Sequence, residues 1–84
     1  MSTNAELLLR RAAAVPRGVA TATTLYVERA ENADIWDVEG RRYVDFASGI
    51  AVLNTGHRHP RVIAAAKAQL DRCTHAAFQV SAYE

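Results

Sequence analysis

The spacing of apolar residues predicts a helix near the start of the chain. Apolar side chains recur there on one helical face, at Ala5, Leu8, Leu9 and Ala12. Thr3 and Glu6 precede this face with the spacing of a capping box. Pro16 and Gly18 are expected to end the helix, because proline disfavours helical geometry for the residue before it.

A second helix is predicted to begin at Pro60, since proline suits the first helical position. Its apolar stripe comprises Val62, Ile63, Ala66, Leu70 and Cys73. The single cysteine, Cys73, cannot form an internal disulfide, and its place in the stripe predicts a buried, reduced thiol. Residues 74–80 are expected to be extended.

Three short runs between the helices predict an antiparallel meander, at residues 25–29, 34–38 and 41–46. Gly40 suits the left-handed position of the loop between the last two runs. Alternation along these strands puts four apolar side chains on what we expect to be one buried side: Trp36, Val38, Val44 and Phe46.

Two features predict that more protein is needed than these 84 residues supply. Residues 50–53 form an apolar run without alternation, which predicts burial on both sides. Ser81 and Glu84 repeat the capping-box spacing at the end of the chain, and no helix follows them. We therefore expect the chain to be the N-terminal piece of a longer protein.

Composition and charge narrow the classes of partner. Half of the residues are hydrophobic and 23% are charged, as in a folded globular chain. The net charge of +1, with the signs interspersed, argues against nucleic acid as a partner. The apolar runs are too short to cross a bilayer and the N-terminus lacks a signal-peptide core, so we expect no membrane association and a cytoplasmic location.

The histidines and the lysine, taken on their own, do not indicate a catalytic or metal-binding site. His57, His59 and His75 raise the possibility of a metal site, but no carboxylate or second cysteine is placed to complete the ligands, so capping and turn roles are predicted instead. Lys67 has no neighbour along the sequence that would activate it. The residues alone therefore predict an α+β segment of helix, three-stranded antiparallel meander and helix, with no catalytic, cofactor-binding or metal-binding residue.

Two stretches carry a resemblance to a known family. WDVEGRRYVDFASGIAVLNTGHRHPRV and FQVSAYE resemble the N-terminal segment of class III, fold-type-I aminotransferases, which are α/β proteins that use pyridoxal 5'-phosphate. The likeness begins at AELLLRRAAAVPRGV and runs to the last residue. GIAVLNTGH and FQVSAYE are most similar to the 4-aminobutyrate branch of that family.

The resemblance implies that residues 1–84 are the N-terminal part of the small domain of a cytoplasmic homo-oligomer, a dimer or higher. That enzyme would move an amino group from 4-aminobutyrate to 2-oxoglutarate, giving succinate semialdehyde and glutamate. The lysine, the phosphate cradle and the large domain that hold the cofactor would lie beyond Glu84. Two alternatives stay open: another ω-aminotransferase, for 5-aminovalerate, ornithine or acetylornithine, or a small interaction module without catalysis.

The resemblance also assigns two substrate-binding residues. Ile50 matches an isoleucine that forms an apolar wall against the substrate chain, and Gln79 matches a glutamine near the active-site entrance. The residues alone leave Ile50 equally compatible with ordinary core packing.

Overall fold

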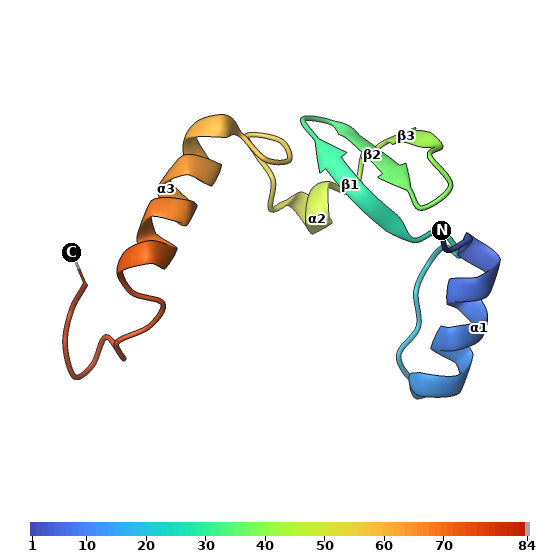
Figure 1. The fold of residues 1–84 in the computed structure, drawn as a ribbon, viewed down its shortest axis with the longest axis horizontal. Helices are drawn as coiled ribbons and strands as arrows, with labels where there is room; N and C mark the ends of the chain where they lie inside the picture. The colour runs from blue at the N-terminus through green and yellow to red at the C-terminus, as the bar shows by residue number, and fades with distance from the viewer. Residues whose placement is uncertain (84) are drawn as a thin grey trace.

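The computed structural model describes residues 1–83 and contains helices at both ends of a small sheet (Figure 1). The elements in chain order are α1 (Asn4–Ala14), β1 (Val27–Glu31), β2 (Asp34–Asp37), β3 (Arg42–Val44), α2 (Ser48–Ala51) and α3 (Pro60–Arg72). The predicted order of helix, meander and helix is confirmed. The short turn α2 is an addition.

The capping residues define α1 as predicted. The Thr3 hydroxyl accepts a hydrogen bond from the Glu6 N–H at 3.2 Å, and the Glu6 carboxylate accepts one from the Thr3 N–H at 2.8 Å. At the other end, Val15 is extended, directly before Pro16. The capping box therefore satisfies two backbone donors that the first turn leaves without helical partners.

The three strands form an antiparallel sheet in the order β1-β2-β3. Gly40 has a φ of 80°, which confirms the left-handed position predicted for the loop between β2 and β3. A bulge interrupts the pairing of β1 with β2 between Val27 and Arg29. Beside it, the Arg29 guanidinium lies 3.5 Å from the centre of the Trp36 ring, a cation–π contact on one face of the sheet.

That face is not buried in this chain, contrary to the prediction. The register pairs Asp34 with Val44 and Trp36 with Arg42, so Trp36 and Val44 do share a face. However, Val44 is 54% exposed and Phe46, just beyond β3, is 93% exposed. Strand alternation determines which side chains share a face, but it does not supply the layer that would cover them.

Asp37 on β2 joins α1 to the hairpin and is completely buried. Its carboxylate accepts hydrogen bonds from the Asn4 amide (3.0 Å), the Tyr43 hydroxyl (3.1 Å) and the Arg41 side chain (3.2 Å). The backbone N–H groups of Glu39 (3.0 Å) and Arg41 (2.9 Å) also donate to it. The polar centre of the sheet is thus one carboxylate surrounded by donors.

These donors decide the charge of Asp37. Burial alone would raise the pKa of this carboxyl, but the hydrogen bonds from the Arg41 N–H, the Asn4 amide, the Arg41 side chain and the Glu39 N–H outweigh it and lower the pKa to about 2. The Asn4 amide oxygen also accepts the Tyr26 N–H at 2.7 Å. Asn4 therefore links the first turn of α1 to the start of the sheet.

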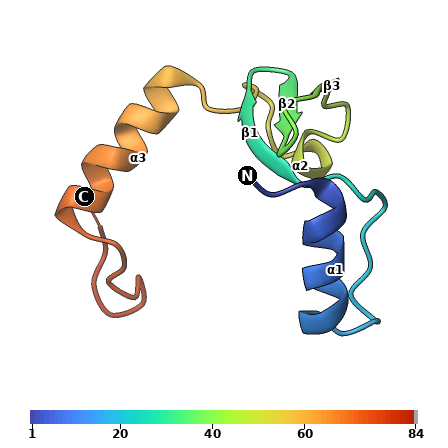
Figure 2. The same ribbon diagram turned by 45° about the vertical axis from the view of Figure 1, so that its right-hand side comes forward.

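The molecule is open rather than compact, and α3 projects away from the sheet (Figure 2). Its radius of gyration is 16.9 Å, whereas a compact domain of this length would have one of about 12 Å. Among residues 1–83 no hydrophobic side chain is fully buried. The polar contacts of the sheet, rather than an apolar core, therefore connect its elements.

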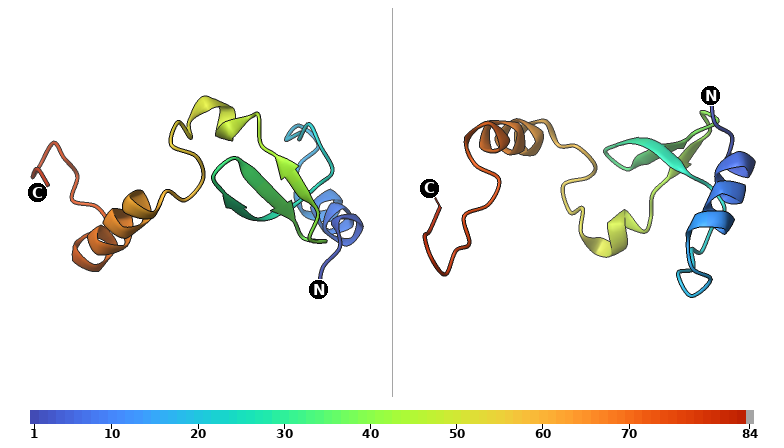
Figure 3. Two further views of the ribbon diagram at one scale, coloured as in Figure 1. Left: turned by 90° about the horizontal axis from the view of Figure 1, so that it is seen from above. Right: turned by 60° about the horizontal axis from the view of Figure 1, so that its bottom comes forward.

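The region from α3 onward differs from the sequence-based expectations in two ways. Cys73 is partly exposed at the end of α3, not buried, because among residues 1–83 no other helix or strand packs extensively against that helix. Residues 74–80 are not an extended run, since Ala77 has a φ of 52° and accepts backbone hydrogen bonds from Val80 and Ser81. This segment curls beyond the end of α3 (Figure 3).

Two further observations concern the C-terminal end of the chain and the length of its helices. The capping signal predicted at Ser81 and Glu84 includes Glu84, which lies outside the described residues. Within the described part of the chain, no helix has the length and apolar character needed to cross a membrane.

Candidate functional site

Ile50 lies in a left-handed turn, the most unusual backbone of the molecule. Ser48, Gly49, Ile50 and Ala51 have φ angles of 48°, 62°, 61° and 60°. For residues other than glycine this conformation costs roughly 1–2 kcal/mol each, and it is rarest for β-branched side chains. The Ile50 side chain is 89% exposed and Val52 is 71% exposed, so burial of residues 50–53 on both sides is wrong for this chain.

Asp45 holds the beginning of this turn. Its Oδ1 accepts the Ser48 N–H at 3.0 Å, and its Oδ2 lies 2.6 Å from Nε2 of His57. Both side chains are largely buried, with Asp45 13% and His57 21% exposed. The hydrogen bond from His57, followed by that from Ser48, holds the pKa of the Asp45 carboxyl below its usual range.

The backbone of His57 is fixed to the sheet. The His57 N–H donates to the Asn32 carbonyl at 2.8 Å, and the Asn32 N–H donates to the His57 carbonyl at 3.0 Å. Gly56 makes this approach possible, because a Cβ on it would lie 3.0 Å from the Asn32 Cα. Gly56 also has a φ of 80°, which favours glycine. The loop of residues 53–57 is therefore attached to the turn between β1 and β2.

Of the three histidines, His59 has the capping role predicted for it, whereas His57 and His75 contact other polar side chains. Nδ1 of His59 accepts the Arg61 N–H at 3.2 Å at the start of α3, and Nδ1 of His75 lies 2.9 Å from the Tyr83 hydroxyl. In residues 1–83 no group of three or more potential ligands could hold a metal ion.

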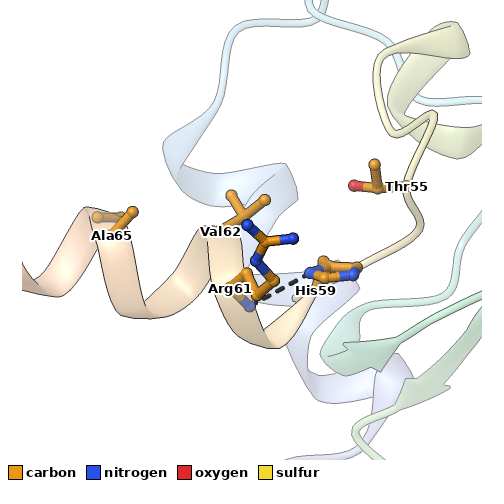
Figure 4. Close-up of a pocket in the computed structure, with 6 residues that line it drawn as sticks. Thr55, His59, Arg61, Val62 and Ala65 are labelled. Atoms are coloured by element: carbon orange, nitrogen blue, oxygen red, sulfur yellow. Dashed lines mark hydrogen bonds between the residues drawn. The ribbon is translucent and has the colours of Figure 1, made fainter.

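A hollow of about 680 Å³ opens beside the start of α3. Figure 4 shows His59 and Arg61 at its edge, with Thr55 on the facing loop and Val62 and Ala65 along the helix. Its walls combine an apolar helix surface with one guanidinium and one imidazole. The hollow is open to solvent, and it contains neither Ile50 nor Gln79.

The structure places the two predicted substrate residues in different parts of the molecule. Gln79 is exposed in the segment after α3, whereas Ile50 belongs to α2 beside the sheet. In the described chain α2 and that segment lie apart, separated by the length of α3 (Figure 1). Their shared role in one substrate pocket stays a prediction.

The described residues do not form a site for pyridoxal phosphate. The cofactor requires a lysine for its covalent link and donors around its phosphate. The only lysine in the sequence, Lys67, is exposed on α3, and its side chain makes no ion pair or hydrogen bond within residues 1–83.

The sequence did not predict a structural or functional role for Asp37 or Asp45. An available signal for Asp45 was its position three residues before Ser48, the spacing at which an aspartate accepts a backbone N–H in a turn or cap. No comparable signal existed for its contact with His57, because 12 residues separate the two.

Comparison with known proteins gives consistent matches. The family model for aminotransferase class-III matches residues 14–84. The chain is 58% identical over 84 residues to 4-aminobutyrate aminotransferase GabT from Escherichia coli (strain K12), covering all of this chain and 20% of that protein. It is 63% identical over 82 residues to 5-aminovalerate aminotransferase DavT from Pseudomonas aeruginosa, covering 98% of this chain and 19% of that protein.

A solved structure agrees with these sequence matches. Ornithine aminotransferase from Toxoplasma gondii matches with a TM-score of 0.81 and 32% identity, over 90% of this chain and 18% of that one. The chain thus spans about a fifth of the length of the curated relatives that it matches.

Proposed function

The chain belongs to the class III aminotransferases, and we propose that it is the N-terminal part of the small domain of a pyridoxal-phosphate enzyme that transfers the amino group of 4-aminobutyrate to 2-oxoglutarate. The products would be succinate semialdehyde and glutamate. We call this longer protein the parent enzyme. The observation that carries the proposal is 58% identity over all 84 residues to a 4-aminobutyrate aminotransferase.

The chain's own contribution would be to the substrate rather than to the cofactor. The cofactor supplies the amino-group chemistry by acting as an electron sink, and its holding residues would belong to the rest of the parent enzyme. Ile50, exposed on its left-handed turn, would form an apolar wall for the methylene groups of the donor. Gln79 would lie near the entrance of the same pocket.

The open apolar surfaces support a role as part of a larger assembly. Phe46 and Ile50 near the sheet, and Val62 and Leu70 on α3, are all more than half exposed. Isolated proteins rarely expose so many large apolar side chains, and such surfaces are typical of interfaces. We propose that the remainder of a cytoplasmic, homo-oligomeric parent enzyme covers them.

A second donor is supported by its own observation. The 63% identity to a 5-aminovalerate aminotransferase favours that substrate, which is longer than 4-aminobutyrate by one methylene. Burial of one CH₂ is worth about 0.8 kcal/mol, so a wall residue alone separates the two donors by only a few-fold. Residues 1–84 are compatible with both.

The test is a donor comparison with the purified parent enzyme. The values of kcat/KM for 4-aminobutyrate, 5-aminovalerate, ornithine and acetylornithine would be measured with 2-oxoglutarate as acceptor, following semialdehyde and glutamate. The proposal expects the highest value for 4-aminobutyrate. A higher value for 5-aminovalerate would replace the donor within the same reaction class. A reading frame that ends at Glu84 and yields a chain without transaminase activity would refute the enzyme proposal and support the interaction module.

A further inference from the structure

Asp45 and His57 meet beneath the turn that carries Ile50, and the function proposed above gives them no role. One carboxylate makes both contacts, with Oδ1 on the Ser48 N–H at 3.0 Å and Oδ2 on Nε2 of His57 at 2.6 Å. Asp45 therefore connects the first residue of the turn with a loop 12 residues further along the chain.

The turn requires such support. Ser48, Ile50 and Ala51 have φ angles of 48°, 61° and 60°, a region that residues with side chains occupy only where surrounding contacts hold them. The Ser48 N–H donates to the Asp45 carboxylate at 3.0 Å, and the Ser48 hydroxyl donates to the Asp45 backbone carbonyl at 3.4 Å. Backbone hydrogen bonds from Ala51 to Ala47 and from Val52 to Ser48 also hold the turn, so we expect loss of the Asp45 carboxylate to loosen it and to change the direction of Ile50.

His57 fixes Asp45 with respect to the sheet. Two backbone hydrogen bonds join His57 to Asn32, and Gly56 lies too close to Asn32 to accept a side chain without a shift. The imidazole that holds Asp45 is consequently attached to the turn between β1 and β2. A continuous set of contacts thus runs from the sheet through His57 and Asp45 to the turn.

We propose that Asp45 and His57 are positioning residues for the amino donor, which hold the left-handed turn so that Ile50 projects outward to contact the methylene chain of the substrate. This role rests on the function proposed above. Neither residue touches the substrate, and both act through Ile50.

A positioning role can be distinguished from general destabilisation of the enzyme, because it affects one of the two half-reactions more than the other. Glutamate carries two carboxylates, which cationic side chains such as arginine bind far better than an apolar wall does, so its half-reaction is expected to depend little on Ile50. Loss of Asp45 should therefore slow the half-reaction with the ω-amino donor selectively. It should also have no further effect once the Ile50 side chain has been removed.

The test uses the parent enzyme with Asp45→Ala, Asp45→Asn and His57→Ala, each with and without Ile50→Ala. Stopped-flow measurements give kcat/KM for both half-reactions, and hydrogen exchange at the Ser48 amide gives a readout independent of activity. Asp71→Ala on α3 is the matched control, because this exposed carboxylate is distant from the turn in sequence.

We expect Asp45→Ala to lower kcat/KM for the ω-amino donor about tenfold and that for glutamate less than about twofold, as a loss confined to donor contacts would. The Ser48 amide should exchange faster. Asp45→Asn keeps an acceptor for the Ser48 N–H but replaces the oxygen that faces His57 by an amide NH2, so it should recover both values only in part. His57→Ala should give the same donor-selective loss at a smaller size, which tests the role even if Asp45→Ala does not fold.

Two results would overturn the inference while leaving the proposed function intact. These are equal losses in the two half-reactions, or a full further loss when Asp45→Ala is added to Ile50→Ala. A wild-type parent enzyme that fails to transaminate any ω-amino acid would instead refute the proposed function, and this role with it.

Discussion

Replacing Gly56 by alanine tests the close approach that attaches His57 to the sheet. The new Cβ would lie 3.0 Å from the Asn32 Cα and 3.1 Å from the Asn32 carbonyl oxygen, against a favourable separation of about 3.5–4.0 Å. Backbone atoms on both sides would have to separate. The two hydrogen bonds between Asn32 and His57 would lengthen or break as a result.

The magnitude follows from two contributions. A φ of 80° costs alanine roughly 1–2 kcal/mol relative to glycine. Loss of two backbone hydrogen bonds adds about 0.5–1.5 kcal/mol each. Gly56→Ala should therefore lower the free energy of local opening by about 2–5 kcal/mol, of which about 1–3 kcal/mol comes from the contact with Asn32.

Gly40 and Gly18 provide matched controls for the two contributions. Gly40 has the same φ of 80°, but a Cβ added to it would meet nothing within 4 Å, so Gly40→Ala isolates the conformational cost. Gly18 has neither feature, so Gly18→Ala should not destabilise. Hydrogen exchange of the parent enzyme would be read at Asn32 and His57 for Gly56→Ala and at Asp37 for Gly40→Ala.

The contact with Asn32 accounts for about 1–3 kcal/mol, and each 1.4 kcal/mol changes the exchange rate about tenfold. The increase in exchange rate should therefore be about 5- to 150-fold larger for Gly56→Ala than for Gly40→Ala. Equal increases for the two variants would show that only the backbone angle matters. The close approach of Gly56 to Asn32 would then have no energetic role.

Three further predictions address charge, substrate and cofactor. The carboxyl of Asp37 should titrate with a midpoint of about 2 by carbon-13 NMR. Because this pKa is below the value in the unfolded chain, the stabilisation that the ionised carboxylate gives is complete above about pH 4 and disappears as the pH falls through about 2. A midpoint at or above 3.8 would contradict the role of the hydrogen bonds to Asp37. Ile50→Gln in the parent enzyme should lower kcat/KM for the ω-amino donor roughly tenfold, because an amide replaces the apolar wall. Stopped-flow measurements should show a smaller loss for glutamate. Equal losses for the two substrates, or no loss for either, would show that Ile50 is not part of the substrate wall. The 84-residue chain alone, treated with pyridoxal phosphate and borohydride, should show no specific adduct by mass spectrometry and no transamination, and a single adduct on Lys67 that supports turnover would contradict this.

The local elements were predictable because they depend on neighbouring residues. The capping box at Thr3, the proline at the start of α3 and the left-handed Gly40 each specify their structure within a few positions. Periodicity also indicated that Trp36 and Val44 share a face. It could not show that this face is open, because alternation does not reveal whether another element covers a face.

The site was harder to predict for a different reason. An apolar run from Ile50 to Leu53 is typical of a buried strand, and side-chain type alone does not reveal four successive positive φ angles. The support for this turn comes from Asp45 and His57, whose contact is not encoded in any local pattern. The family resemblance singled out Ile50 as a substrate residue, which stays a prediction, and it indicated neither Asp45 nor His57.

The absence of a fully buried hydrophobic side chain among the described residues has a consequence for biosynthesis. At roughly 5–20 residues per second, a ribosome would complete this segment in about 4–17 s and would need about four times longer for the rest of a relative-sized chain. The hairpins pair residues close in sequence, so they can form as soon as they emerge. Phe46, Ile50 and Leu70 would meanwhile be exposed to solvent, which makes the nascent segment a candidate for chaperone binding.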